Sequence, residues 1–203
     1  MIATTYFDKG RRHTTLFIAT VFLLLVFTIL AAVYFGYFRS QQGKQNAYDR
    51  LIWEAAARHH VSPFLVKAVI ARESSFRASA KGKMGEMGLM QITDGAVKDW
   101  ARHTGHRPPL PGLLFDPRLN VEIGTWYLGR GLLRWHDYRS RNVLALAHYN
   151  AGAGNARKWA PEIPSQKVEL NTISFPSTRE YIRVVLENWN SFEREHRARE
   201  PNQ

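Results

Sequence analysis

AVIARESSF, residues 68–76, and GEMGLMQIT, residues 85–93, are the two stretches of this 203-residue chain that decide its fold class. In the first stretch, Val69 and Ile70 precede Glu73 by four and three residues, which is the spacing of neighbours on one face of a helix. The pattern therefore predicts a helix that carries Glu73 on its apolar face. The second stretch has two glycines three residues apart, which predicts a turn whose backbone comes close to a ligand or to another segment.

Glu73 is the candidate catalytic residue of this pattern. An apolar environment raises the pKa of a carboxyl group, and an acid whose pKa is close to neutrality can protonate a leaving oxygen. The structural alternative is a carboxylate paired with Arg72 or Arg77, or an exposed acid at the helix end. Helical periodicity alone does not separate these interpretations.

Two further segments carry side chains that suit a sugar-binding site. Met90 offers an adaptable apolar wall, and Gln91 offers an amide for hydroxyl or N-acetyl groups. Tyr149 and Asn150 belong to ALAHYNAGAGN, residues 145–155. Taken singly, each segment is also typical of an ordinary turn or helix end.

The rest of the pattern predicts a mainly α fold. Apolar residues recur at helical spacing beyond residue 47, while the alternation typical of strands is almost absent. Proline and capping residues mark helix starts at Ser62-Pro63, Thr93, Asp116-Pro117 and Asn142. We expect irregular structure over residues 161–176 and helices at about 48–56, 63–75, 93–103, 116–135, 142–152 and 177–195, with one short turn at 155–159.

An uncharged apolar segment lies near the N-terminus, from Leu16 to Phe38. At about 1.5 Å per residue it is long enough to cross a hydrocarbon core of roughly 30 Å. Basic residues outnumber acidic ones in residues 1–15, so the positive-inside rule places the N-terminus in the cytoplasm. A cleaved signal peptide is the alternative, although the apolar run is longer than the usual run of roughly 7–15 residues.

These features together predict five parts of the chain. The predicted parts are a basic cytoplasmic N-terminus at 1–15, a transmembrane signal-anchor helix at 16–38, a polar linker at 39–47, a catalytic domain at 48–195 and a polar tail at 196–203.

The composition limits the partners and excludes some chemistry. The formal net charge is +11, which favours polyanions: nucleic acid, anionic lipid headgroups or an acidic cell-wall polymer. A basic surface without a specific partner is the alternative, and the absence of a nucleic-acid motif argues against nucleic acid. The chain has no cysteine, and its eight histidines show no convincing ligand spacing with acids, so we expect no disulfide, no metal and no cofactor.

Taken together, the motifs resemble those of the lytic transglycosylases of the Slt type, which share the goose-type lysozyme fold. The family pattern begins with the pair Glu73-Ser74 and continues with Gly-x-x-Gly-Leu-Met-Gln at residues 85–91. Its third block matches Tyr149-Asn150-Ala151-Gly152, and its last block, Thr-Arg-x-Tyr, matches residues 178–181. The resemblance covers about residues 47–192, including a segment at 116–128 that is similar to the scaffold helix of the family.

The resemblance implies a lysozyme-like helical domain that acts on peptidoglycan glycan strands without a cofactor. Glu73 would protonate the oxygen between N-acetylmuramic acid and N-acetylglucosamine. It would then help the muramic C6 hydroxyl to attack C1, which closes a 1,6-anhydro ring without water. The side chains implied to contact the substrate are those of Ser74, Met90, Gln91, Tyr149, Asn150 and Tyr181.

The chain departs from the family pattern at four positions. Gly82 stands where many relatives have serine, and Glu86 stands where alanine is usual, which adds a carboxylate near the groove. His148 replaces a usual alanine, and Ser177 replaces a usual glutamate. These departures bear on subsites and rate more than on reaction class.

Our main hypothesis is a single-pass inner-membrane enzyme with its N-terminus in the cytoplasm and its catalytic domain in the periplasm, trimming glycan or opening the wall for an envelope assembly complex. A muramidase of the same fold that admits water is the first alternative, and Glu86 motivates it. A non-catalytic wall-binding scaffold is the second, motivated by Gly82 and Ser177. A nucleic-acid binder is suggested by charge alone.

Overall fold

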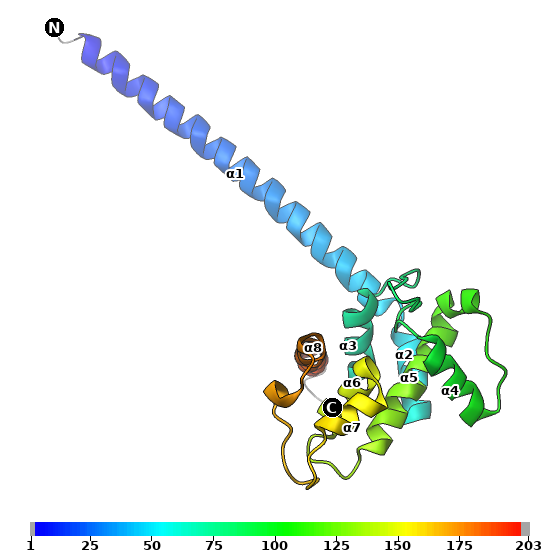
Figure 1. The fold of residues 1–203 in the computed structure, drawn as a ribbon. Helices are drawn as coiled ribbons and strands as arrows, with labels where there is room; N and C mark the ends of the chain where they lie inside the picture. Colours follow the sequence, from blue (N-terminus) through cyan, green and yellow to red (C-terminus); the bar gives the residue numbers. More distant parts are fainter. Residues whose placement is uncertain (1–2, 200–203) are drawn as a thin grey trace. The chain divides into compact units, whose positions relative to one another are not determined.

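The computed structural model of this chain describes the backbone of residues 3–199 and the side chains of residues 17–40 and 42–199. It divides the chain into two units, Met1–Asn46 and Ala47–Gln203, each of which is described by itself (Figure 1).

The first unit is one long helix, α1 (Ala3–Asn46). Its side chains from Phe17 to Phe38 are almost all apolar and exposed. By length and composition this helix could cross a bilayer, with a mean hydropathy of 2.7 in its most apolar window of the described residues. A signal sequence meets the same criterion, so the alternative of a cleaved signal peptide stays open. The polar stretch 39–46, predicted as a linker, continues the helix because glutamine and lysine are good helix formers and no proline interrupts it.

The second unit is helical, which confirms the predicted mainly α fold class. Within residues 47–199 there is no strand, and β pairing is limited to two isolated bridges, Lys81 with Met87 and Met87 with Ile92. The helices are α2 (Asp49–His59), α3 (Pro63–Ser74), α4 (Asp94–Thr104), η1 (Pro111–Phe115), α5 (Pro117–Arg134), α6 (Arg141–Ala151), α7 (Ala153–Trp159), η2 (Leu170–Thr172) and α8 (Pro176–Arg199).

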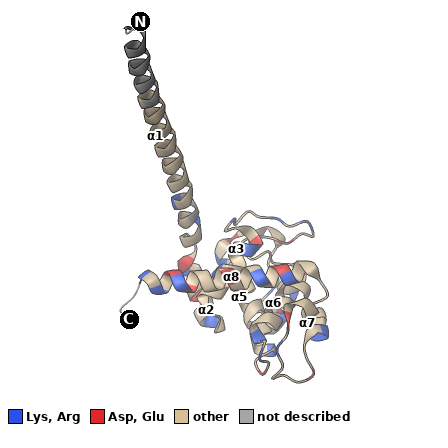
Figure 2. Ribbon diagram, turned by 90° about the vertical axis from the view of Figure 1, so that its left-hand side faces the viewer, with Lys and Arg blue, Asp and Glu red and all other residues tan. Residues whose placement is uncertain are grey.

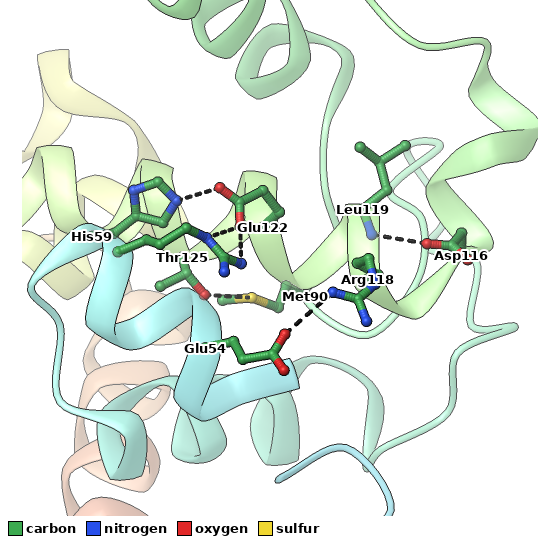
Figure 3. Close-up of polar contacts among 9 residues, drawn as sticks. Glu54, His59, Met90, Asp116, Arg118, Leu119, Glu122 and Thr125 are labelled. Atoms are coloured by element: carbon green, nitrogen blue, oxygen red, sulfur yellow. Dashed lines mark hydrogen bonds and ion pairs between the residues drawn. The ribbon is translucent and has the colours of Figure 1, made fainter. Parts of the chain in front are cut away.

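The sequence signals for helix starts are confirmed in part. The Thr93 hydroxyl accepts a hydrogen bond from the Ala96 amide at 3.2 Å, and the Asp116 carboxylate accepts one from the Leu119 amide at 2.9 Å (Figure 3). The predicted cap at Asn142 is wrong, because α6 begins at Arg141 and Ser140 occupies the N-cap position. The Ser140 hydroxyl accepts a hydrogen bond from the backbone amide of Val168 at 2.8 Å and so holds the irregular segment instead of the helix end.

The core forms where α5 packs against α2, α4 and α6, and where α3 packs against α8. Leu65, Val69 and Ile70 of α3 are at most 1% exposed, so the apolar face predicted for this helix is the buried one. Burial of such side chains contributes about 1.5–3 kcal/mol each. The consequence for the site is that the end of α3 is fixed between α8 and the centre of the domain.

Charged residues are distributed over several helices and loops of the second unit (Figure 2). Many of them form surface pairs one helical turn apart, such as Arg183 with Glu180 and Glu187. Surface pairs of this kind contribute little to stability, so the core rather than the charge pattern holds the helices together.

Candidate active site

Glu73 lies in the last turn of α3, immediately before the chain leaves the helix. The next residues, Ser75 and Phe76, have φ values of 51° and 61°, and the Ser75 amide donates a hydrogen bond to the Ala71 carbonyl at 3.1 Å. Two successive non-glycine residues in the left-handed region are uncommon, and such strain persists where the surroundings determine it. The sharp exit from the helix leaves Glu73 at its end, next to the loop that follows.

That loop, residues 80–92, folds back on itself through backbone hydrogen bonds. The amides of Met87 and Ile92 donate to each other's carbonyls at 3.2 and 2.9 Å, and the Gly88 amide donates to the Ala80 carbonyl at 2.8 Å. Gly88 has a φ of 78°, and a Cβ at this position would lie 2.4 Å from the Leu114 carbonyl oxygen. The second glycine of the motif is therefore required by close packing as well as by conformation.

Asn120, on the buried face of α5, holds the loop in place. Its side chain is fully buried: Oδ1 accepts a hydrogen bond from the Met90 amide at 2.8 Å, and Nδ2 donates to the carbonyls of Met87 and Leu114 at 2.8 and 2.7 Å. Asn120 is not among the residues that the sequence motifs indicated. A lone asparagine among the apolar positions of the helix at 117–134 was the available signal, because buried amides are almost always hydrogen-bonded.

The end of α6 contributes Tyr149 and Asn150. The Tyr149 hydroxyl donates a hydrogen bond to the Met90 carbonyl at 2.9 Å, which joins α6 to the loop. The Thr178 hydroxyl of α8 donates to Oδ1 of Asn150 at 2.8 Å, which joins α6 to α8. The four motifs that lie apart in the sequence therefore meet around the end of α3.

Between these elements lies a cavity of about 300 Å³. Its lining combines predicted site residues with charged and small residues of the loop: Glu73, Gly82, Lys83, Glu86, Gln91, Thr93, Tyr149 and Asn150.

Burial raises the pKa of the Glu73 carboxyl to about 7. The neighbouring Tyr181 hydroxyl and the Arg72 guanidinium lower this pKa, and the Glu86 carboxylate raises it. The Tyr181 hydroxyl is close enough to act on Glu73, but the contact falls short of a well-formed hydrogen bond. Burial also raises the pKa values of Tyr149 and Tyr181 well above their ordinary range, so both phenols stay protonated.

The structural alternative for Glu73, a pair with a neighbouring arginine, does not form among the described residues. Nε of Arg77 donates instead to the Ser74 carbonyl at 3.0 Å, and the Arg72 guanidinium lies 5.7 Å from the centre of the Tyr181 ring. Glu73 is therefore a partly buried acid that forms no ion pair with any side chain that the structure describes, although the Arg72 charge acts on it from a distance.

Three of the residues expected to contact the substrate do not line this cavity. The exposed fractions of Ser74, Met90 and Tyr181 are 2%, 0% and 2%. The Ser74 hydroxyl donates to the Ile70 carbonyl at 3.2 Å, and the Met90 side chain packs against Gly124 and Thr125 of α5 (Figure 3). These three side chains are thus packed inside the domain next to the cavity, and their expected contact with the substrate stays a prediction.

Among the described residues there is no group of three or more His, Asp or Glu side chains placed to hold a metal ion. The cavity offers acid–base chemistry by the Glu73 carboxyl group, with the Glu86 carboxylate and hydrogen-bonding side chains in the same lining.

Comparison with known proteins finds a match to the family model described as the transglycosylase SLT domain over residues 50–170, which is more than half of the chain. A soluble lytic murein transglycosylase of Salmonella typhimurium is 30% identical over 148 residues, covering 69% of this chain and 22% of the relative. A membrane-bound lytic murein transglycosylase C of Yersinia pestis is 33% identical over 118 residues, covering 55% of this chain and 33% of the relative.

Solved structures give the same result for the fold. An inactive variant of the lytic transglycosylase Slt from Pseudomonas aeruginosa matches with a TM-score of 0.67 and 26% identity, covering 75% of this chain and 25% of that chain. A 70-kDa soluble lytic transglycosylase in complex with bulgecin A matches equally well, with a TM-score of 0.67 and 27% identity. The predicted lysozyme-like fold of the Slt type is thereby confirmed. This chain spans about a fifth of the length of its soluble relatives. It belongs to the family of transglycosylase SLT domains.

Proposed function

We propose that this chain is a membrane-anchored lytic transglycosylase that cleaves the bond between N-acetylmuramic acid and N-acetylglucosamine in peptidoglycan and leaves 1,6-anhydro-muramic ends. The observation that carries the proposal is Glu73, whose pKa is raised by burial to about 7 inside the cavity and which has no ion pair among the described residues. An acid with this pKa is protonated at the start of the reaction and can also release its proton near neutrality.

Two proton transfers by the same carboxyl group complete the reaction. Protonated Glu73 gives its proton to the glycosidic oxygen as the bond from this oxygen to muramic C1 breaks. The resulting carboxylate then takes the proton of the muramic C6 hydroxyl as its oxygen bonds to C1. The net change is one C–O bond broken and one formed, with the proton moved from O6 to the leaving oxygen and no water consumed.

Gln91, Tyr149 and Asn150 are proposed to position the glycan. Nε2 of Gln91 is occupied by the carbonyls of Ala80 and Gly88, at 3.1 and 2.9 Å, so Oε1 is the atom left for the substrate. Ser74, Met90 and Tyr181 are proposed to act indirectly, by holding α3, the loop and the Glu73 carboxyl in place.

α1 is proposed to anchor the enzyme in the inner membrane, with residues 1–15 in the cytoplasm, 16–38 in the bilayer and the catalytic unit in the periplasm. A span of this length and hydropathy and the membrane-bound name of the Yersinia pestis relative support this arrangement. Proximity to the membrane suits work on newly made glycan or beside an envelope assembly complex.

A hydrolytic muramidase of the same fold is the second candidate. It is favoured by one observation: Glu86 is a second carboxylate that lines the cavity of Glu73. Two-carboxylate glycosidases use such a group to activate water or to form a covalent intermediate.

The test is to incubate the full chain in detergent with purified peptidoglycan, beside Glu73→Gln and a control, Glu180→Gln, which removes an exposed acid of α8. Mass spectrometry of the soluble products should show anhydro-muramic ends from the wild type and the control and none from Glu73→Gln. Reducing ends would establish the muramidase, and full activity of Glu73→Gln would contradict both candidates. Binding to peptidoglycan without any product would indicate a wall-binding scaffold.

A further inference from the structure

Glu86 is held in a defined position by the turn that carries it. Its backbone carbonyl accepts a hydrogen bond from the Gly82 amide at 2.7 Å, and the Gly85 amide donates to the Gly82 carbonyl at 3.3 Å. Its side-chain Oε2 accepts a hydrogen bond from the Met84 amide at 3.0 Å. The carboxylate is therefore folded back over its own turn, and Oε1 has no hydrogen-bond partner among the described residues.

Gly82 provides the space that this conformation needs. A Cβ at residue 82 would lie 2.1 Å from Oε2 of Glu86 and 2.9 Å from Oε1 of Gln91. Both distances are shorter than any real Cβ contact, so a side chain at this position and the observed Glu86 conformation exclude each other. Two of the four departures from the family pattern, Gly82 and Glu86, are thus parts of one arrangement.

The same distances place the side-chain oxygens Oε2 of Glu86 and Oε1 of Gln91 over Gly82, and Oε2 already accepts the hydrogen bond from the Met84 amide. Oε1 of Gln91 is identified as the oxygen because the other amide atom, Nε2, donates to two backbone carbonyls. Among the described residues no donor reaches Oε1 of Glu86 or Oε1 of Gln91, and both side chains line the cavity, so a ligand in the cavity can supply the missing donors.

We propose that Glu86 and Gln91 form an acceptor pair, with Gly82 as its floor, that binds a hydrogen-bond donor of the glycan: a sugar hydroxyl or the N–H of an N-acetyl group. This assignment rests on the proposed function and makes Glu86 a specificity-determining residue. A bond from such a donor to a carboxylate is charge-assisted and is about twice as strong as a neutral one. The charge also disfavours a carboxylate of the substrate at this position.

A second consequence follows from the charges that surround Glu73. The charged groups are Arg72 on its own helix and Glu86 and Lys83 on the loop, and the neutral titratable groups are Tyr149 on α6 and Tyr181 on α8. Glu86 is the acid in this set that disfavours ionisation of Glu73. Removing its charge should therefore move the alkaline fall of activity to lower pH, an effect that a purely structural residue would not produce.

The decisive experiment compares Glu86→Ala and Glu86→Gln with Glu180→Gln in the full chain. On peptidoglycan strands, Glu86→Ala should raise KM at least tenfold and change kcat by less than threefold, while Glu180→Gln should match the wild type. Glu86→Gln keeps one acceptor but loses the charge. Its KM should lie between those of Glu86→Ala and the wild type, and its alkaline fall of activity should move to lower pH. Unchanged KM and pH profile in both Glu86 variants would overturn the assignment, and so would loss of kcat with KM retained.

Binding measurements in the inactive Glu73→Gln background separate this inference from the proposed function. There, Glu86→Ala should weaken binding of N-acetylglucosamine tetramer and of peptidoglycan strands about tenfold, whether or not the wild type turns substrate over. If the wild type forms no product while this loss of binding is seen, the proposed function fails and the acceptor pair stands. Equal binding with and without Glu86→Ala refutes the acceptor pair, whatever the wild type does.

Gly82→Ala tests the geometry of the pair. The new Cβ should displace the flexible Glu86 carboxylate rather than unfold the turn, so thermal stability should change little while KM rises. In a Glu86→Ala background the same substitution should raise KM by a clearly smaller factor. An equal rise in both backgrounds would show that Gly82 does not act through Glu86.

Discussion

Glu73 and Glu122 are both partly buried glutamates on helices of the same domain, and their surroundings shift their pKa values in opposite directions. Burial raises the pKa of Glu73 to about 7. Hydrogen bonds from His59 and Arg58 lower the pKa of Glu122 to about 2, against the opposing effect of burial. Oε1 of Glu122 lies 2.7 Å from Nε2 of His59, and Oε2 lies 2.6 Å from the Arg58 guanidinium (Figure 3).

The difference shows what makes an acid available for proton transfer. Glu122 joins α5 to the end of α2 through its ion pairs. It therefore has the structural role, a carboxylate paired with a neighbouring basic residue, that was the alternative interpretation of Glu73. Glu73 lacks such a partner among the described residues, because Arg72 and Arg77 at its helix end turn to other groups. Desolvation is fully compensated at Glu122 but only in part at Glu73, where Tyr181 and Arg72 offset less than burial adds, so the Glu73 carboxyl favours its neutral form.

The largest expected difference between the two acids is in activity. Glu73→Gln should reduce kcat/KM by about a thousandfold or more, because general acid–base catalysis commonly contributes about 10²–10⁴. Glu122→Gln should stay within about threefold of the wild type at 25 °C, since it lies outside the cavity. Steady-state kinetics on peptidoglycan strands measure kcat/KM of both variants. A large loss of kcat/KM in a correctly folded Glu122→Gln would contradict the distinction between a catalytic and a structural glutamate.

The second-largest expected effect is the pH dependence of folding stability that Glu73 causes. Because its pKa is raised in the folded state, folding favours the protonated form, and wild-type stability should fall as pH rises from about 4.5 to about 7. Glu73→Gln removes this fall and should be more stable than the wild type above pH 7 by on the order of 3 kcal/mol, since the pKa of Glu73 is raised by about 2.5 units and each unit corresponds to about 1.4 kcal/mol. Urea unfolding at pH 4 and pH 8 measures the difference, which should vanish at the lower pH.

For Glu122 we expect stability to change with pH in the opposite direction. Its pKa is lowered in the folded state, so its contribution is fully present above about pH 4.5 and is lost as pH falls towards 2. At pH 7, Glu122→Gln should be less stable than the wild type by about 2 kcal/mol, a typical value for hydrogen bonds to a charged group. Thermal unfolding of the two proteins should converge near pH 2, and a constant difference across pH would contradict the ion pair.

The smallest effect concerns Tyr181, whose hydroxyl lowers the pKa of Glu73. Tyr181→Phe should raise this pKa and move the alkaline fall of activity upward by a few tenths of a pH unit, because a weak interaction with the charged form is lost. The pH profile of kcat/KM measures the shift. A downward shift would mean that Tyr181 instead stabilises the protonated acid.

The sequence alone determined the class of the fold and indicated Glu73 as the candidate acid. Apolar spacing predicted α3 and the buried face on which Glu73 lies, and the order of four short motifs indicated the family. These features are local or depend on chain order, so they can be read without coordinates. Helix ends were less well predicted. The N-cap of α6 is Ser140, whose hydroxyl accepts a hydrogen bond from the distant Val168 amide, and residues 39–46 are helical.

The tertiary structure decided which side chains reach the cavity and how the acid is tuned. Met90, expected at the substrate, is buried beneath the loop, while Asn120, which gave little signal, fixes that loop through three hydrogen bonds. The opposite pKa shifts of Glu73 and Glu122 depend on partners such as Tyr181 and Arg58, which lie far away in the sequence. Burial and hydrogen bonding between distant segments cannot be read from periodicity, because they exist only after the helices have packed.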